Sequence, residues 1–574
     1  MTTATDLFAH HQPTLARALA ATRDRTYWSA YPESLKAYGE DGTVSTEDGK
    51  AAFEGYLGKP FPLQQLDGEG TESQVGGERS PYGLDLGVTY PHLDSDRAVD
   101  AAMAALPAWR DAGPDARAAV CLEILVRINA RSHEMASAVM HTSGQAYAMA
   151  FQAGGPHAQD RALEAIAYAY AEMTRHVPEA VWEKPQGKRP PQRMTKKFAV
   201  VPRGVALVIG CNTFPTWNSY PGLFASLVTG NPVLVKPHPR AVLPLAITVL
   251  IAREVLTEAG FSPDLVLLMP EQDGEGLAKT LAMRPEVRII DYTGSTAFGE
   301  WLEHNATHAA VFTEKAGVNS VVLDSTDDYR GMLANLAFSL SLYSGQMCTT
   351  PQNLLLPRDG ITVNGERKTV DQVAQDLAAA VDGLLGDDAR ATELLGAVVN
   401  QGVLDRLDAA PAYGDVVLRS REVKHPDFPE ATVRTPLVVR LDVEDREHYL
   451  RECFGPVAFL ITTENTDQSI AVLRESVREQ GAITASIYST DEDVLHAAED
   501  AALDAGVALS CNLTETVYVN QSAAFSDFHA TGANPAANAA LTDAAYVAGR
   551  FRIVQSRRHL PAEATESAEA TTAN

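Results

Sequence analysis

The fold is decided by four short apolar runs: Val205-Ala-Leu-Val-Ile209, Pro232-Val-Leu-Val235, Leu265-Val-Leu-Leu-Met269 and Val287-Arg-Ile-Ile290. Each run has the length of a buried strand. A helical pattern from Leu245 to Ala259 separates the second run from the third, and it stops at Gly260, a residue type that favours the left-handed conformation after a helix. Because strands and helices alternate, this stretch predicts a doubly wound parallel sheet.

A second alternating set lies further along the chain. It begins near Val318 and continues through the apolar runs Val457–Ile461 and Ile483–Tyr488. The chain has 574 residues, which is more than one hydrophobic core normally holds. The sequence therefore predicts an α/β protein with two α/β domains.

The regions outside these sets are less regular. Residues 1–95 are rich in Gly, Asp and Glu, and we expect an irregular leader around short helices. Apolar residues from Asp96 to Ser143 recur at helical spacing. Residues 180–200 are basic and rich in proline, which favours a surface hairpin or arm. The end of the chain, residues 558–574, has no apolar core and is expected to be disordered.

Charge and cysteine content limit the function classes. The chain carries 47 basic and 74 acidic side chains, a net charge of −27, which disfavours binding to nucleic acid or to anionic membranes. Its start lacks the pattern of a secretory signal, and no apolar run reaches the ~18 residues of a membrane span. The 5 cysteines are dispersed, as in a reducing cytoplasm, and no Cys-x-x-Cys pair indicates a zinc site. We therefore expect a cytoplasmic protein without a bound metal.

Four short motifs carry side chains suited to chemistry. They are the turn Gly294-Ser295 after a strand, Glu314 at the end of a strand-like run, Cys348 within Gly-Gln-Met-Cys-Thr, and Glu452 before a Phe-Gly-Pro turn. A glycine-serine turn before a helix can bind phosphate through backbone N–H groups. Each motif alone is commonly structural, since a lone cysteine is usually a small buried hydrophobe.

Together the four motifs resemble the aldehyde dehydrogenase superfamily in order and spacing, over roughly residues 96–557. The resemblance implies that Cys348 is the nucleophile that attacks an aldehyde. It implies that Glu314 is the general base for the hydrolytic water, a role suited to a carboxylate whose pKa is raised by burial. The implied fold has a Rossmann-like cofactor domain, an α/β catalytic domain and a small β oligomerisation extension.

The same resemblance implies a nicotinamide cofactor and its ligands. The turn of Gly294 and Ser295 would bind a phosphate, and Lys236 would bind the adenosine ribose. Glu452 would hold the nicotinamide ribose, with Phe454 beside the nicotinamide.

The resemblance also divides the chain into parts. We expect an NAD(P)-binding Rossmann-like domain at residues 96–176 and 201–313, and a catalytic domain at residues 314–530. Residues 177–200 and 531–557 would form the oligomerisation extension, which implies a homodimer or a homotetramer.

Two departures from the family pattern narrow the prediction. The sequence Glu314-Lys-Ala-Gly-Val-Asn319 resembles the PaaN-type branch, which acts on CoA-linked semialdehydes in aerobic phenylacetate degradation. The family's asparagine before Phe-Pro is replaced by Thr213, and the nearest asparagine is Asn212. Either the Asn212 amide or the Thr213 hydroxyl would then help to stabilise the oxyanion, with the backbone N–H near Cys348 carrying a larger share.

The stretch Lys236-Pro-His-Pro-Arg240 bears on the choice of cofactor. Dehydrogenases that prefer NAD commonly hold the adenosine ribose with a carboxylate, which repels a 2′-phosphate. In the family this acid usually stands three residues after the lysine, where this chain has Pro239. No Asp or Glu lies between Lys236 and Arg253. The sequence therefore predicts that NADP is preferred over NAD, with Arg240 as a phosphate ligand.

These features predict the oxidation of an aldehyde to a carboxylic acid through a thiohemiacetal and a thioester on Cys348. The expected substrate is a small-molecule aldehyde, specifically a CoA-linked semialdehyde from phenylacetate or related aromatic degradation. Two alternatives stay open: a CoA-acylating relative, in which CoA resolves the thioester, and a catalytically idle scaffold of the same fold. Glu314 disfavours the first alternative, and the joint presence of Cys348, Glu314 and Glu452 disfavours the second.

Overall fold

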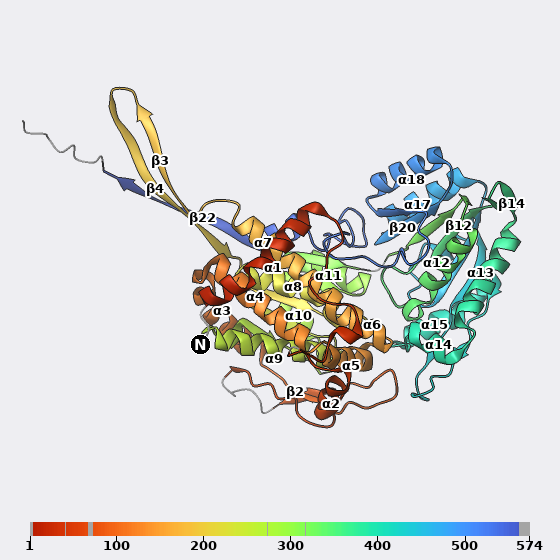
Figure 1. The fold of residues 1–574 in the computed structure, drawn as a ribbon, viewed down its shortest axis with the longest axis horizontal. Helices are drawn as coiled ribbons and strands as arrows, with labels where there is room; N and C mark the ends of the chain where they lie inside the picture. The colour runs from red at the N-terminus through yellow and green to blue at the C-terminus, as the bar shows by residue number, and fades with distance from the viewer. Residues whose placement is uncertain (1–3, 41, 67–72, 273, 316, 562–574) are drawn as a thin grey trace, which may run out of the picture.

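The computed structural model describes residues 4–40, 42–66, 73–272, 274–315 and 317–561. Over these ranges the chain forms two lobes, each built on one large sheet, and an arm that projects from the first lobe (Figure 1). No helix in the described ranges combines the length and the apolar character needed to cross a membrane.

The first lobe contains a five-stranded sheet in which all neighbouring strands are parallel. In spatial order its strands are β7 (Val266–Leu268), β6 (Val233–Lys236), β5 (Val205–Ile209), β8 (Val287–Thr293) and β9 (Ala310–Glu314). The four apolar runs form β5 to β8, which confirms the predicted parallel sheet. The helix expected from Leu245 is α9 (Leu243–Glu258), and Gly260 follows it with a φ of 84°.

Helices cover both faces of this sheet because alternate strand residues point to opposite sides. On β5, Val208 belongs to the core that contains α8 (Pro215–Val228) and α9. Leu207 belongs to the core on the other face, with α3 (Ser95–Asp111) and α10 (Leu277–Ala282).

The second lobe contains a seven-stranded sheet, parallel except for β15 at one edge. In spatial order its strands are β15 (Asp415–Leu418), β18 (Leu437–Asp442), β19 (Val457–Thr463), β12 (Asn353–Pro357), β10 (Ser320–Leu323), β20 (Thr484–Tyr488) and β21 (Ala508–Cys511). Helices α12 (Tyr329–Ser341) and α13 (Val370–Leu385) cover one face, and α17 (Thr466–Gln480) and α18 (Glu492–Ala505) cover the other (Figure 1).

The two sheets present opposite ends to each other. Strand β9 ends in Glu314, at the carboxyl edge of the first sheet. Cys348 shortly precedes β12, at the amino edge of the second sheet. The Glu314 carboxylate and the Cys348 thiol lie within 4.8 Å of each other, so the candidate site occupies the junction of the lobes.

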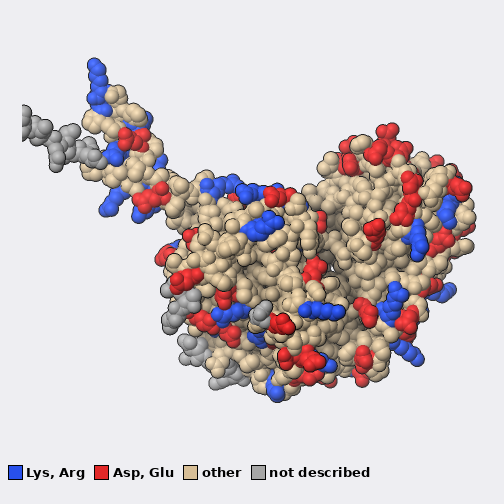
Figure 2. All heavy atoms as spheres, in the orientation of Figure 1, with Lys and Arg blue, Asp and Glu red and all other residues tan. Residues whose placement is uncertain are grey.

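The arm is an antiparallel sheet in the order β22 (Phe551–Leu560), β4 (Arg189–Pro202) and β3 (Glu179–Gln186). It confirms the hairpin expected at residues 180–200, and Figure 2 shows lysine and arginine side chains gathered on it. Exposed apolar side chains, among them Val181 and Val554, line this arm. Its role in joining subunits stays a prediction.

Two expected boundaries need correction. The segment 531–557 was expected to belong wholly to the oligomerisation extension, but part of it packs on the first lobe. There the Asn538 carboxamide oxygen accepts a hydrogen bond from the Thr313 N–H at 2.8 Å. The expected tail begins too early, since residues 558–560 complete β22. Residues 562–574 lie outside the described residues.

The leader is more regular than expected. It begins with α1 (Ala4–Asp24), a helix of 21 residues that packs against α4 (Gly113–Ala130) and α7 (Ala158–Met173) (Figure 1). Its buried side chains are Leu15, Ala18 and Ala21 together with the polar His11 and Thr22. Because apolar and polar residues mix on this face, the apolar pattern is weak in the sequence and packing stabilises the helix.

The helical stretch expected at residues 96–143 forms three helices, α3, α4 and α5 (Ser132–Ser143). Further helices and short strands are α2 (Thr46–Tyr56), α6 (Tyr147–Gln152), α11 (Thr296–Asn305), α14 (Asp388–Leu394), α15 (Gln401–Ala409), α16 (Arg446–Tyr449), α19 (Ala544–Ala548), β1 (Gln74–Gly76), β2 (Thr89–Pro91), β11 (Ser325–Thr326), β13 (Ile361–Val363), β14 (Glu366–Lys368), β16 (Glu422–Val423) and β17 (Val433–Arg434).

Candidate active site

Cys348 lies on a tightly turned loop between α12 and β12. Three consecutive residues, Tyr343, Ser344 and Gly345, have left-handed φ values of 55°, 51° and 66°. A side chain at Gly345 would place its Cβ 2.4 Å from the carbonyl oxygen of Gly455. Glycine is therefore needed at Gly345, where the loop meets the Phe-Gly-Pro turn.

Asn319 anchors this loop to the second sheet. Its amide nitrogen donates to the carbonyl oxygens of Cys348 and Thr350, at 2.7 and 3.0 Å. Its amide oxygen accepts from the backbone N–H groups of Ile483 and Thr484, at 3.0 and 3.2 Å. The last residue of the Glu314–Asn319 motif thus fixes the backbone that carries the thiol.

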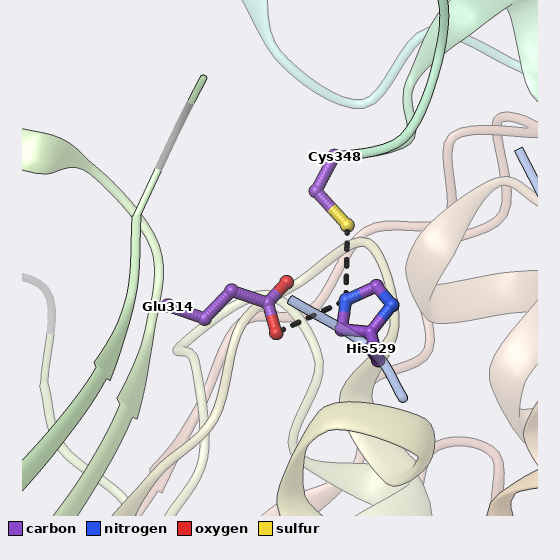
Figure 3. A group of neighbouring side chains, drawn as sticks. All are labelled: Glu314, Cys348 and His529. Carbon is purple, nitrogen blue, oxygen red and sulfur yellow. Dashed lines mark hydrogen bonds and ion pairs between the residues drawn. The ribbon is translucent and has the colours of Figure 1, made fainter. Parts of the chain in front are cut away.

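One ring nitrogen of His529 faces both the Cys348 thiol and the Glu314 carboxylate (Figure 3). Its Nε2 is 3.8 Å from the Cys348 Sγ and 3.3 Å from the Glu314 Oε2. From α8, the Asn218 Nδ2 donates to both Glu314 oxygens at 3.4 Å. The site therefore joins a thiol, an imidazole, a carboxylate and an amide from both lobes.

Burial and nearby charge set the protonation of these groups. Burial raises the pKa of the Cys348 thiol well above its usual value, and the Glu314 carboxylate raises it further. Burial also acts to raise the pKa of Glu314, but the charge and hydrogen bonding of His529 outweigh it and the pKa is lowered. The expectation of a raised pKa at Glu314 is therefore wrong, because its buried partner stabilises the carboxylate.

A cavity of about 590 Å³ opens on one side of Cys348. Aromatic side chains from separate parts of the chain line it, including Trp28, Trp217, Phe338 and Tyr518. Trp28 belongs to the leader, so the N-terminal segment forms part of this wall. Among the described lining residues there is no lysine and no arginine.

A small second hollow lies on the other side of Cys348. Glu452 and Phe454 line it together with the Cys348 loop, so both predicted nicotinamide contacts lie beside the thiol. Burial raises the pKa of Glu452 to about 7, although the charge of Arg406 acts in the opposite direction. Arg406 also donates to the Phe454 carbonyl oxygen at 2.9 Å, which holds the turn.

The two candidate oxyanion donors point elsewhere. The Asn212 amide nitrogen donates to the Asn400 side chain at 3.4 Å, and Asn212 is absent from the described lining of the large cavity. The Thr213 hydroxyl contacts the Cys211 sulfur at 3.7 Å. Asn218 lines the cavity beside Cys348 instead. The structure thus brings Asn218, and not Asn212, to the reacting thiol.

Lys236 is paired with an acid that the sequence did not indicate. Its Nζ forms an ion pair with Glu271, which follows β7, the strand next to β6. A carboxylate therefore faces Lys236, although no Asp or Glu lies between Lys236 and Arg253 in the sequence. The Arg240 guanidinium lies against the Val399 carbonyl and the Asn400 side chain, at 3.5 and 3.4 Å.

The turn of Gly294 and Ser295 lies at the start of α11. Ser295 is the N-cap residue of α11, and its side chain makes no capping hydrogen bond to the helix. A side chain at Gly294 would place its Cβ 2.4 Å from the Tyr292 hydroxyl. A dinucleotide site combines helix N–H groups that donate to phosphate with a lysine and carboxylates that bind the ribose hydroxyls. The start of α11, Lys236, Glu271 and Glu452 supply these groups, so they fit the expected cofactor.

A model of the aldehyde dehydrogenase family matches residues 90–544. The chain belongs to the aldehyde dehydrogenase family. A solved structure described as an NAD-dependent aldehyde dehydrogenase from Burkholderia multivorans is 57% identical to this chain, with a TM-score of 0.95, over 98% of this chain and 100% of that one.

Two more distant matches are a curated protein and a solved structure. A 1-pyrroline-5-carboxylate dehydrogenase of Bacillus thuringiensis (strain Al Hakam) is 22% identical, over 80% of this chain and 87% of that protein. The structure of a 1-pyrroline-5-carboxylate dehydrogenase from Thermus with bound NAD is 19% identical, with a TM-score of 0.70, over 93% of this chain and 99% of that one.

Three side chains of this aldehyde dehydrogenase site were missed from sequence: Asn218, His529 and Glu271. Asn218 lies one helical turn after Phe214, so helical spacing from the Phe-Pro motif was an available signal. Glu271 follows a strand of the predicted sheet, and the ends of parallel strands share one edge. His529 follows no strand or motif that sequence reasoning had placed at the site.

Proposed function

We propose that this aldehyde dehydrogenase uses NAD to oxidise free, apolar or aromatic aldehydes to carboxylic acids. The proposal rests on one observation: Cys348 separates a large apolar cavity from the hollow that holds Glu452 and Phe454. An aldehyde in the first and a nicotinamide in the second would meet at the thiol. The aldehyde carbon would then lie between its nucleophile and its oxidant.

The residues of the chain divide the work of the reaction. Cys348 Sγ adds to the carbonyl carbon to give a thiohemiacetal. The nicotinamide dinucleotide, when bound, supplies the hydride acceptor that converts this adduct into a thioester. Glu314 takes a proton from the water that hydrolyses the thioester, and its lowered pKa keeps it ionised for this task.

Asn218 supplies the amide that we infer for the oxyanion in place of Asn212. Its Nδ2 already lies on the Cys348 side of the site, because it donates to Glu314 and lines the same cavity as the thiol. An amide donor aimed at the developing oxyanion is worth a large factor in rate.

The ion pair of Lys236 and Glu271 favours NAD over NADP. A carboxylate at this edge would accept hydrogen bonds from the adenosine ribose hydroxyls and repel a 2′-phosphate. The description of the Burkholderia multivorans relative as NAD-dependent supports the same choice. We therefore propose NAD, in place of the NADP preference expected from sequence.

Replacement of Glu271 by Gln is expected to weaken this discrimination. The wild-type protein should use NAD with a kcat/KM at least roughly 10-fold above that for NADP, and Glu271→Gln should lower the ratio by roughly 10- to 100-fold, the range for a hydrogen bond to a charged group. Steady-state rates with both cofactors on one aldehyde measure this. Glu275→Gln is the matched control, because Glu275 contacts His92 from the same loop. A wild-type preference for NADP would overturn the proposal.

The cavity disfavours a CoA-linked substrate. Four carboxyl side chains line it, namely Glu33, Asp160, Glu393 and Asp527, and none of its described lining residues is a lysine or an arginine. The phosphates of a CoA group would need cations at this wall. Stacked and edge-on rings, such as Phe338 and Tyr518 with centroids 3.9 Å apart, suit an apolar group instead.

A panel of aldehydes tests the substrate class. We expect kcat/KM for phenylacetaldehyde and hexanal to exceed that for succinic semialdehyde by roughly 10²-fold, because an anion would meet like charges in an apolar site. NADH formation should not require CoA. A preference for the anionic aldehyde would contradict this class, a strict need for CoA would favour the acylating alternative, and no turnover with any aldehyde would favour the idle scaffold.

A further inference from the structure

The His529 side chain is held firmly against the Cys348 thiol. Its backbone exchanges two hydrogen bonds with Leu541, at 2.9 and 2.8 Å. Its ring packs edge-on against Trp217, with centroids 4.7 Å apart at 75°. Only 4% of the residue is exposed, and Nε2 is the ring atom that faces both Sγ and the Glu314 carboxylate (Figure 3).

The thiol needs a proton acceptor before it can attack. A neutral thiol is a poor nucleophile, and burial together with the Glu314 charge favours the neutral form of Cys348. Glu314 is the acid proposed to deprotonate water in the later hydrolysis. Among the described groups that can accept a proton, the His529 imidazole is the one, besides Glu314, that contacts the thiol, with Nε2 at 3.8 Å from Sγ.

We propose that His529 is a catalytic residue, whose Nε2 takes the proton of the Cys348 thiol before attack and returns it when the acid product leaves. This inference rests on the proposed function, since it concerns the same covalent cycle. It assigns separate proton acceptors to the two half-reactions: His529 to thiol attack and Glu314 to hydrolysis.

The bonds and protons balance over the cycle. The S–H bond breaks, its electron pair stays on sulfur, and the proton forms an N–H bond at Nε2. The C–S bond forms as the carbonyl pair moves to oxygen, and that carbon then loses a hydride to the nicotinamide dinucleotide, which is the oxidant. Water adds to the thioester while Glu314 takes one of its protons. The C–S bond breaks to release the carboxylic acid, the Nε2 proton returns to sulfur, and Glu314 passes the water proton to solvent.

Among the described residues, Glu314 is the charged side chain in contact with the His529 ring. Behind the Trp217 ring lies Arg161 of α7, whose guanidinium carbon is 5.6 Å from the ring centroid. Arg161 is itself paired with Glu164 at 2.8 Å, so these two charges compensate each other. The Asp527 carboxylate accepts the backbone N–H of Ala523 at 2.8 Å. At 3.3 Å from Nε2, the Glu314 carboxylate is the charge that pairs with a protonated ring.

Alkylation of Cys348 tests the proposal without any aldehyde. Iodoacetamide reacts with the thiolate, so the modification rate of the Cys348 peptide, followed by mass spectrometry across pH, reports its ionisation. His529→Gln should slow this reaction roughly 10-fold or more at pH 7 and shift its inflection to higher pH. His304→Gln, on the surface helix α11, should match the wild type. An unchanged profile, or slower reaction without a shift in inflection, would overturn the proposal.

Transient kinetics supply the second readout. His529→Gln should slow the burst of NADH by roughly 10²-fold at neutral pH, with recovery as the pH rises, the pattern of a lost general base. His529→Asn, checked for native circular dichroism, should behave alike and guards against a folding defect in one variant. A normal burst in both variants would overturn the role of His529. Failure of the wild type to oxidise any aldehyde would overturn the proposed function alone, because alkylation still judges His529.

Discussion

Replacement of Cys348 by Ala is expected to abolish aldehyde oxidation, with kcat falling by roughly 10⁴-fold or more, as when the nucleophile of a covalent enzyme is removed. The thiol acts on the substrate, and the predicted cofactor contacts come from other residues, so NAD binding should stay within about twofold of wild type. Steady-state NADH formation measures the first effect. Titration with NAD, followed by the quenching of the protein's tryptophan fluorescence, measures the second.

The control for this variant is another cysteine. Cys511→Ala, at the end of β21, removes a thiol that no described contact places at the site, and it should retain wild-type kcat. If Cys348→Ala keeps more than a trace of activity, the nucleophile lies elsewhere and the covalent mechanism fails.

Glu314→Gln should separate the two halves of the reaction. One equivalent of NADH should still form, because thiol attack and hydride loss do not need the base for water. Turnover should then fall by roughly 10²- to 10⁴-fold, the usual contribution of a general base. Stopped-flow measurement of NADH absorbance shows the burst and the slow phase in one trace.

The exposed Glu300 on α11 offers a matched control, since Glu300→Gln changes a carboxylate on the solvent side of the same lobe. It should leave both phases unchanged. A Glu314→Gln trace without any burst would mean that Glu314 also takes part in activating the thiol.

Local sequence predicted the parts of the fold that depend on local pattern. The strands of the first sheet and α9 follow from apolar run length and a terminal glycine, and the arm follows from its proline-rich basic composition. The leader helix α1 was not predicted, because its buried face mixes polar residues such as His11 with apolar ones and is stabilised by packing on α4 and α7.

In the candidate site, too, the sequence predicted the residues that belong to local motifs and missed those that tertiary structure brings in. Cys348, Glu314, Glu452 and Phe454 carry motifs. Cys348, Glu452 and Phe454 line the small hollow, and the Glu314 carboxylate lies within 4.8 Å of the thiol. The position of Asn212 was harder to predict, because the loop before α8 turns its amide toward Asn400.

The predicted preference for NADP rested on the residues that follow Lys236 in the sequence, which include no acid before Arg253. The carboxylate that pairs with Lys236 comes instead from the neighbouring strand, since Glu271 follows β7 and reaches Lys236 at the end of β6. Likewise the pKa of Glu314 is governed by His529, which joins the site only through tertiary structure. Contacts between distant segments, and not local patterns, decided both outcomes.

The most direct test of the account is to trap the covalent intermediate on Cys348. Glu314→Gln protein mixed with NAD and phenylacetaldehyde, quenched in acid and digested, should give a peptide with Cys348 that is heavier by the mass of the aldehyde less two hydrogen atoms, the signature of a thioester. The same peptide from Cys348→Ala should be unmodified. No acyl adduct, or an adduct on a residue other than Cys348, would contradict oxidation through a cysteine thioester.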